Sequence, residues 1–339
     1  MMKNLFDYAT RELSQDAFLR WLFENYKCEN ESVKNAFRKL FDSFTNNKFE
    51  KKEITDLKTV AQWKNIDVTI WFKVDGKEHL IVIEDKTGSG IHDDQLKRYS
   101  EEINNHNDFW RNEENRKKYK TERYVEDDEN IFKVFYKTNI IDQWEKDNAI
   151  KNAWKIYDIY SIYELFANID TDSEVLGYYK EYIKKIYSAA NRETSPSEWG
   201  LISWHSFFND YQTPESVSKK KEINCYQKEY FYMKLFVKGH ENDMPCFEIR
   251  SRDLIYDENK KKCSIQVRAV LYNLLKQADE QTIKSWQDSL KKQGFKLNYR
   301  KDISKHKQIG TIYIENIDNT EKAMTIALDS IGELLSALF

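Results

Sequence analysis

Residues 65–70 of this chain read NIDVTI, and residues 80–86 read LIVIEDK. Both runs are rich in β-branched residues, which favour β-strands. The Asp-Gly pair at residues 75–76 lies between them and is typical of a tight hairpin turn. We therefore expect two neighbouring strands, over residues 66–73 and 79–85, joined as a β-hairpin.

Helices and strands surround this hairpin in the first half of the chain. Apolar residues recur at helical spacing in residues 11–26, and a strongly charged helix is expected from residue 93 to about residue 123. Strands are expected at residues 131–137 and 154–157, followed by a helix at residues 159–169. This order predicts an α/β fold in which helices flank both faces of a mixed central sheet.

The second half of the chain has a different pattern, with several strands in succession. A polar segment that contains a proline and a glycine, residues 191–200 (NRETSPSEWG), marks the expected domain boundary. We expect one domain over residues 1–190 and a C-terminal α+β domain of unknown role over residues 201–339. The elements expected in this second domain are strands at 231–237, 246–251, 264–271, 295–299 and 311–315, and helices near 279–292 and at 320–338.

The composition indicates a soluble protein that is neither exported nor embedded in a membrane. The chain has 339 residues, of which 33% are charged, and a mean hydropathy of −0.81. No apolar run approaches the roughly 18 residues needed to span a bilayer, and the four cysteines are scattered without a CxxC pair. We therefore expect a cytoplasmic protein without a disulfide framework or structural zinc. The net charge of −3 gives no electrostatic argument for nucleic-acid binding.

Two carboxylates and a lysine are expected to converge at the ends of the two hairpin strands. Asp67 follows an apolar strand residue, and Glu84 and Lys86 lie two residues apart, so both point to one face of their strand. Asp85 points the other way, but its backbone carbonyl lies beside the same site. Hard oxygen ligands of this kind favour Mg²⁺ or Mn²⁺, and such an ion can activate water for phosphodiester cleavage. The alternative is an ordinary exposed ion pair between Glu84 and Lys86 at a strand end.

Three further polar residues extend this candidate site. Gln95 and Tyr99 are four residues apart in the expected charged helix, so they share one helical face. Residues 87–91 (TGSGI) connect Lys86 to that helix and suit a substrate-facing loop. Glu12, in the first expected helix, could add a carboxylate through a bound water. The alternatives are a solvent-facing polar pair for Gln95 and Tyr99, and a capping-box role for Glu12.

Together these residues resemble the PD-(D/E)xK nuclease superfamily. The resemblance covers about residues 5–170 and is closest to bacterial proteins whose first helix carries a glutamate followed by an L-x-W-L run. In those proteins an acidic strand, an ExK strand and a Q-L-x-x-Y helix follow, and the QxxxY element is also similar to that of RecB-type and λ-exonuclease-type nucleases. Where the signature has a proline before the aspartate, this chain has Ile66. The residues that carry the resemblance are Glu12, Leu19, Trp21, Leu22, Asp67, Glu84, Asp85, Lys86, Gln95, Leu96 and Tyr99.

The resemblance implies a restriction-endonuclease-like core and a role for each motif residue. Asp67 and Glu84, with the backbone carbonyl of Asp85, would bind Mg²⁺ or Mn²⁺. Lys86 would be the catalytic lysine, and Glu12 would be the additional catalytic carboxylate of the first helix. The proline that Ile66 replaces makes no contact with the metal, so the family tolerates this change.

The resemblance also implies a substrate and leaves alternatives open. Gln95 and Tyr99 would contact the substrate strand or organise the site. DNA is the expected substrate, with RNA as the second candidate, in restriction, repair or defence. The alternative from another class is a non-cleaving protein that keeps the nuclease fold as a nucleic-acid-binding or protein-interaction module. The C-terminal domain would read DNA, bind a protein partner or form a homo-oligomer.

Overall fold

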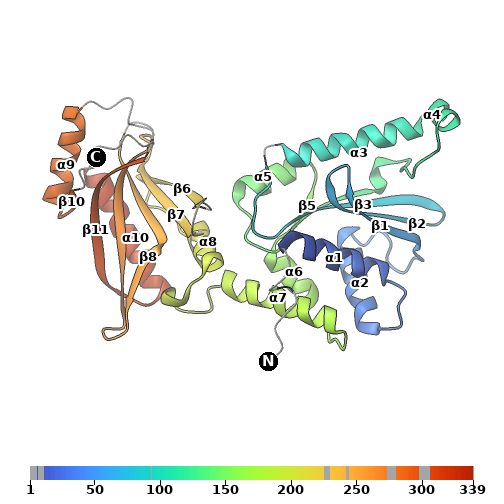
Figure 1. Cartoon of the computed structure of the whole chain (residues 1–339), viewed down its shortest axis with the longest axis horizontal. Coiled ribbons are helices and arrows are strands. Elements are labelled where there is room, and N and C mark those ends of the chain that lie inside the picture. The colour runs from blue at the N-terminus through green and yellow to red at the C-terminus, as the bar shows by residue number, and fades with distance from the viewer. Residues whose placement is uncertain are drawn as a thin grey trace. The chain divides into compact units, whose positions relative to one another are not determined.

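The computed structural model describes Phe6 and residues 11–92, 94–224, 230–241, 244–272, 280–297 and 306–338 (Figure 1). The chain divides into two compact units, Met1–Ser188 and Ala189–Phe339, and each is described by itself. The segment expected to mark the domain boundary, residues 191–200, lies in the second unit. Within the described residues, no helix is both long enough and apolar enough to cross a membrane.

The first unit contains a mixed five-stranded sheet in which sequence order is also spatial order. The first three strands are antiparallel neighbours, and the last two are parallel to the third. The expectation of an α/β fold with a mixed sheet is therefore confirmed. The strands are β1 (Thr55–Trp63), β2 (Ile66–Val74), β3 (Lys77–Lys86), β4 (Ile131–Lys137) and β5 (Lys155–Tyr157).

The hairpin between β2 and β3 forms as its sequence predicts. Val74 pairs with Lys77 across a two-residue turn. Both turn residues have positive φ, 51° at Asp75 and 78° at Gly76. A type I′ turn requires this conformation at both positions, and Asp-Gly adopts it at low cost. The turn sets the register of the two strands that carry the candidate site.

Helices cover both faces of this sheet (Figure 1). On one face lie α1 (Arg11–Glu24) and α2 (Glu31–Phe44), where the rings of Phe41 and Phe72 meet edge to face at 5.1 Å. On the other face α3 (Gln95–Arg111) packs Leu96 among strand residues such as Val82. Because both faces are covered, β3 is buried from residue 79 to its end.

The remaining helices of the first unit differ in part from expectation. The long helix expected over residues 93–123 ends at Arg111, because the extended backbone of Asn112 interrupts it. The Asn112 side chain then accepts hydrogen bonds from two backbone amides and caps a separate short helix. The sequence interpretation also missed α2, β1, the helix Gln143–Lys151 and the helix Glu174–Ala190. The further helices are α4 (Glu113–Lys118), α5 (Gln143–Lys151), α6 (Ile159–Ala167) and α7 (Glu174–Ala190), which crosses the division between the units.

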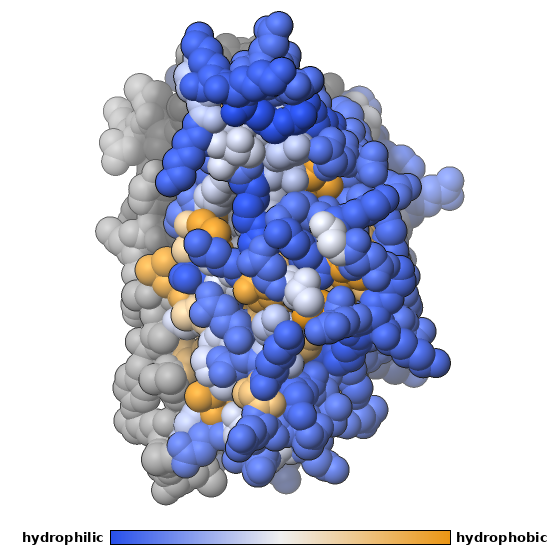
Figure 2. All heavy atoms as spheres, turned by 90° about the vertical axis from the view of Figure 1, so that its right-hand side faces the viewer, coloured by the Kyte–Doolittle hydropathy of each residue, from blue (hydrophilic) through white to orange (hydrophobic). Residues whose placement is uncertain are grey.

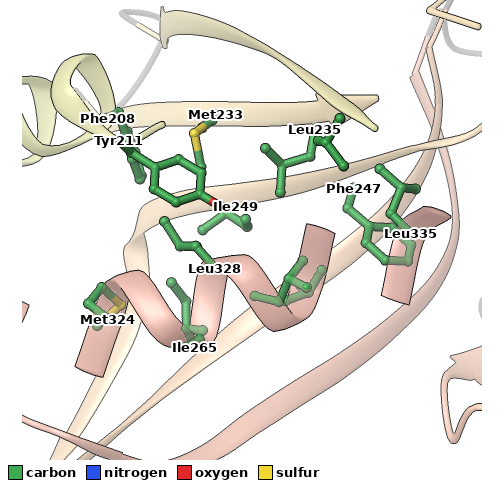
Figure 3. Packing of buried hydrophobic residues seen from close by; sticks show 14 of the residues in the cluster. Phe208, Tyr211, Met233, Leu235, Phe247, Ile249, Ile265, Met324, Leu328 and Leu335 are labelled. Atoms are coloured by element: carbon green, nitrogen blue, oxygen red, sulfur yellow. The ribbon is translucent and has the colours of Figure 1, made fainter. Parts of the chain in front are cut away.

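The second unit is an antiparallel sheet with helices, as expected for an α+β domain. Its strand order is β10-β11-β9-β8-β7-β6. Figure 3 shows Leu328 and Leu335 of the last helix among side chains such as Phe247 and Ile249 from the sheet. Residues 298 and 299 of the expected strand at 295–299, and residue 279 of an expected helix, lie outside the described residues. The elements are α8 (Leu201–Asp210), β6 (Val217–Asn224), β7 (Tyr230–Val237), β8 (Cys246–Asp257), β9 (Lys262–Tyr272), α9 (Glu280–Lys292), β10 (Lys296–Leu297), β11 (His306–Asp318) and α10 (Glu321–Leu338).

The surface agrees with the high content of charged residues. Figure 2 shows a mainly hydrophilic face with only small, separate apolar patches. Apolar side chains are instead concentrated between the sheet and its helices. Burial of this apolar surface is therefore the main term that stabilises the unit.

Replacing Ile83 by alanine should destabilise the first unit by about 2–5 kcal/mol, because it leaves a cavity beside the central strand. Ile83 is fully buried in β3, whereas Ile150 of α5 is 67% exposed. The matched Ile150→Ala variant should change the free energy of unfolding by no more than about 0.5 kcal/mol. Urea denaturation of both variants measures the difference, and equal losses would contradict the central position of β3.

Candidate active site

The pairing of β2 with β3 brings the residues of the candidate site together. Val68 pairs with Ile83, so Asp67 lies opposite the end of β3. There the Asp85 backbone N–H donates to Asp67 Oδ2 at 2.9 Å. Residues 17 to 19 positions apart in the sequence thus become neighbours through the sheet.

The Lys86 ammonium lies among the three oxygens that the sequence assigns to a metal. Its Nζ is 2.5 Å from Glu84 Oε1 and 3.8 Å from Asp67 Oδ2. It also donates to the backbone carbonyl of Asp85 at 3.1 Å. Two carboxylates and one carbonyl therefore surround a single cationic atom. The three oxygens thus face one point, which the Lys86 ammonium occupies.

Glu84 is fully buried at the end of β3. Its Oε1 accepts from Lys86 and from Gln95 Nε2, the latter at 2.7 Å, whereas its Oε2 has no hydrogen-bond partner among the described residues. Burial and, secondarily, the charge of Asp67 raise the pKa of Glu84 to about 8. A buried oxygen without a partner costs free energy unless a ligand occupies it, so Glu84 Oε2 is well suited to bind a cation.

Gln95 and Tyr99 of α3 join the same cluster. The Gln95 side-chain amide donates to Tyr99 Oη at 3.0 Å as well as to Glu84. Its oxygen accepts from the backbone N–H of His92 at 3.2 Å. Because these bonds orient the amide and Gln95 is buried, the alternative of a solvent-facing pair is wrong for Gln95. Tyr99 is half-buried.

Asp85 faces the opposite side of the sheet and connects it to α1. Its Oδ1 accepts from Gln15 Nε2, and Gln15 Oε1 accepts from Thr138 Oγ1 at 2.7 Å. Burial and the nearby carboxylates of Asp16 and Asp67 hold the pKa of Asp85 well above its ordinary value. This network fixes α1 against the strand that carries Glu84 and Lys86. The side chain of Glu12 lies outside the described residues.

A second buried ion pair adjoins the site, and the sequence interpretation missed it. Lys137 of β4 pairs with Lys86 in the parallel register of the sheet. Its Nζ is 2.8 Å from both carboxylate oxygens of Glu145, and both side chains are buried. Glu145 also accepts from the backbone N–H of Ile91 at 3.3 Å, which ties the loop after Lys86 to α5. The capping-box spacing of Asp142 and Glu145 was the available sequence signal.

The donor set suits a hard divalent cation. Carboxylates of Asp67 and Glu84 and the carbonyl of Asp85 are the oxygen ligands that Mg²⁺ and Mn²⁺ prefer. Within the part of the chain that the structure describes, there is no group of three or more His, Cys, Asp or Glu side chains that could hold a metal. A metal here would therefore take two carboxylates, the carbonyl and its own waters.

Comparison with known proteins identifies no relative: no protein-family model, no curated protein and no solved structure matches this chain. The function therefore has to be inferred from the site itself.

Glu84→Gln should remove a pH dependence of stability measured in the presence of a chelator. The ordinary pKa of a glutamate is near 4.5, and that of Glu84 in the folded protein is about 8. Between these values the folded state keeps a proton that the unfolded chain has released. The free energy of unfolding should therefore fall as pH rises, by at most about 1.4 kcal/mol per unit. Denaturation curves from about pH 5 to 8 test this, and identical slopes for wild type and variant would contradict it.

Glu145→Gln should destabilise the first unit by about 3–5 kcal/mol, because it leaves the Lys137 ammonium buried without a countercharge. Combining it with Lys137→Met should recover most of this loss, which a double-mutant cycle measures. Asp147→Asn, at an exposed position of the same helix, is the matched control. A Glu145→Gln effect no larger than that of the control would rule out a buried ion pair.

Proposed function

We propose that this protein is a Mg²⁺- or Mn²⁺-dependent nuclease of the PD-(D/E)xK type that hydrolyses phosphodiester bonds. The observation that carries the proposal is the convergence of Asp67, Glu84 and the Asp85 carbonyl around the Lys86 ammonium. Acidic oxygens and a lysine at one point are the groups that metal-assisted phosphodiester hydrolysis requires. DNA is the proposed substrate, and RNA is the second candidate.

The order of the structural elements supports a restriction-endonuclease-like core. A helix, α1, precedes the acidic strand β2, the ExK strand β3 and the QxxxY helix α3. The resemblance stated from the sequence implies this succession, around a mixed sheet with helices on both faces. The sheet brings Asp67 to Glu84, and α3 brings Gln95 to the same carboxylate.

Each residue of the site has a separate part in the proposed reaction. A bound Mg²⁺ would polarise the scissile phosphate and lower the pKa of a coordinated water. Asp67, Glu84 and the Asp85 carbonyl would hold the ion. Lys86 would orient the attacking water or stabilise charge on the phosphate. Gln95 would fix the orientation of Glu84 through its hydrogen bond to Oε1.

The proposed setting is the bacterial cytoplasm, in restriction, repair or defence. Among the described residues Cys28 and Cys263 are free thiols, which is compatible with a reducing compartment. For the second unit we propose a role in reading DNA, binding a protein partner or forming a homo-oligomer.

Lys86→Met should lower the cleavage rate at least about 100-fold while keeping the length and apolar packing of the side chain. The assay uses labelled linear, circular and single-stranded DNA and a matched RNA, with Mg²⁺, Mn²⁺ or a chelator. Lys97→Met, at an exposed position of α3, is the control and should cleave like wild type. Circular substrates show whether cleavage needs an end.

Two results would overturn the proposal. Cleavage that persists in the chelator, or in Lys86→Met at the wild-type rate, would separate the activity from this site. Absence of both cleavage and Mg²⁺ binding in the wild type, with DNA binding retained, would instead favour the non-cleaving module.

A further inference from the structure

Trp144 is the most exposed tryptophan of the chain and has no core to fill. All nine tryptophans lie in the described residues, and Trp144 alone among them is exposed, at 50%. It lies in the first turn of α5, next to the buried Glu145. The exposed part of this ring offers a flat apolar face on which another ring can stack.

The ring lies against the loop that follows the catalytic strand. A Cβ atom added to Gly90 would meet Trp144 Cζ2 at 3.4 Å and Cη2 at 3.8 Å. Because Gly90 has no side chain, the backbone of the loop can lie close to one edge of the indole ring. The loop belongs to the connection from Lys86 to α3, so the exposed ring lies beside the segment that joins two parts of the proposed active site.

The surroundings hold this ring in place. Glu145, the next residue, binds Lys137 with both oxygens and accepts from Ile91 N–H, so α5 and the loop are tied to each other. Lys137 in turn pairs with Lys86 across the parallel strands β3 and β4. An aromatic platform that is fixed before binding loses little conformational entropy on binding.

One basic side chain near the ring could pair with a phosphate of a nucleic-acid strand. Lys151 lies seven residues after Trp144, on the same face of α5, and forms no ion pair with any described residue. The acid between them, Asp147, accepts a hydrogen bond from Gln143 Nε2 at 2.9 Å. An exposed indole with a free lysine on one face matches the way proteins bind single strands, by stacking bases and pairing phosphates.

We propose that Trp144 is the stacking platform for an unpaired nucleobase beside the scissile phosphate. The inference rests on the proposed nuclease and defines its substrate class: a single strand, or a duplex end or distortion with unpaired bases. In a fully paired duplex each base is stacked on its neighbours and cannot stack on Trp144. The affinity for such a duplex should therefore not depend on Trp144.

The test measures binding apart from cleavage. Fluorescence anisotropy in a chelator and low salt follows a labelled single-stranded DNA oligonucleotide, the matching RNA, and a blunt duplex of the same sequence. Trp144→Ala should weaken binding to the single strand about 5- to 150-fold, the usual strength of base stacking on an aromatic ring. Trp144→Phe should retain most of the affinity, and duplex binding should change less than about twofold.

Ile150→Ala is the matched control, because Ile150 is an exposed apolar residue on another face of the same helix. It should bind single strands like wild type. Three results would each overturn the inference. The first is that Trp144→Ala and Ile150→Ala weaken single-strand binding equally, and the second is that Trp144→Ala weakens single-strand and duplex binding equally. The third is that the wild type does not bind single strands. The DNA and RNA arms show which strand supplies the base.

Failure of the inference can be told apart from failure of the proposed nuclease. Trp144-dependent single-strand binding by a wild type that never cleaves would support the platform and remove the nuclease. If Lys86→Met abolishes cleavage but Trp144→Ala does not change binding, the proposed nuclease is supported and the stacking role of Trp144 is overturned.

Discussion

The antiparallel register of β2 and β3 is the constraint on which the candidate site depends. It places Asp67 against the backbone N–H of Asp85, and thereby beside Glu84 and Lys86. A shift of one residue would turn Glu84 and Lys86 to the opposite face of the sheet. The type I′ turn at one end of the hairpin and the buried apolar residues along it prevent such a shift. The site is thus a direct product of the strand pairing that builds the core.

Buried charges are concentrated where the parallel strands β3 and β4 end. Lys86 pairs with Glu84, and next to it Lys137 pairs with Glu145. Apolar residues of similar volume often stabilise a protein as well as a buried ion pair does. Two adjacent buried pairs in one small region are therefore weak evidence for a stabilising role. Perturbed carboxylates in such surroundings mark candidate functional sites, and the raised pKa of Glu84 fits this pattern.

The sequence predicted several elements with strong local patterns, although it missed α2, whose apolar residues do recur at helical spacing. The β2–β3 hairpin and β4 have alternating or continuous apolar residues between clear turns, and they form where expected. The edge strand β1 is mostly polar and exposed, and the short α5 buries few residues, so neither has the apolar periodicity that reveals an element. Because α5 was missed, so was Glu145, which binds Lys137 and ties the loop after Lys86 to this helix.

From the sequence alone, the residue types of the site and their local geometry could be determined: Glu84 and Lys86 share a strand face, and Gln95 and Tyr99 share a helix face. These relations depend only on the repeat of a strand or helix. Only the tertiary structure decided that Gln95 binds Glu84, that Lys137 and Glu145 adjoin them, and that burial raises the pKa of Glu84. The physical reason is that desolvation and long-range contacts arise from packing of distant segments, which no local pattern encodes.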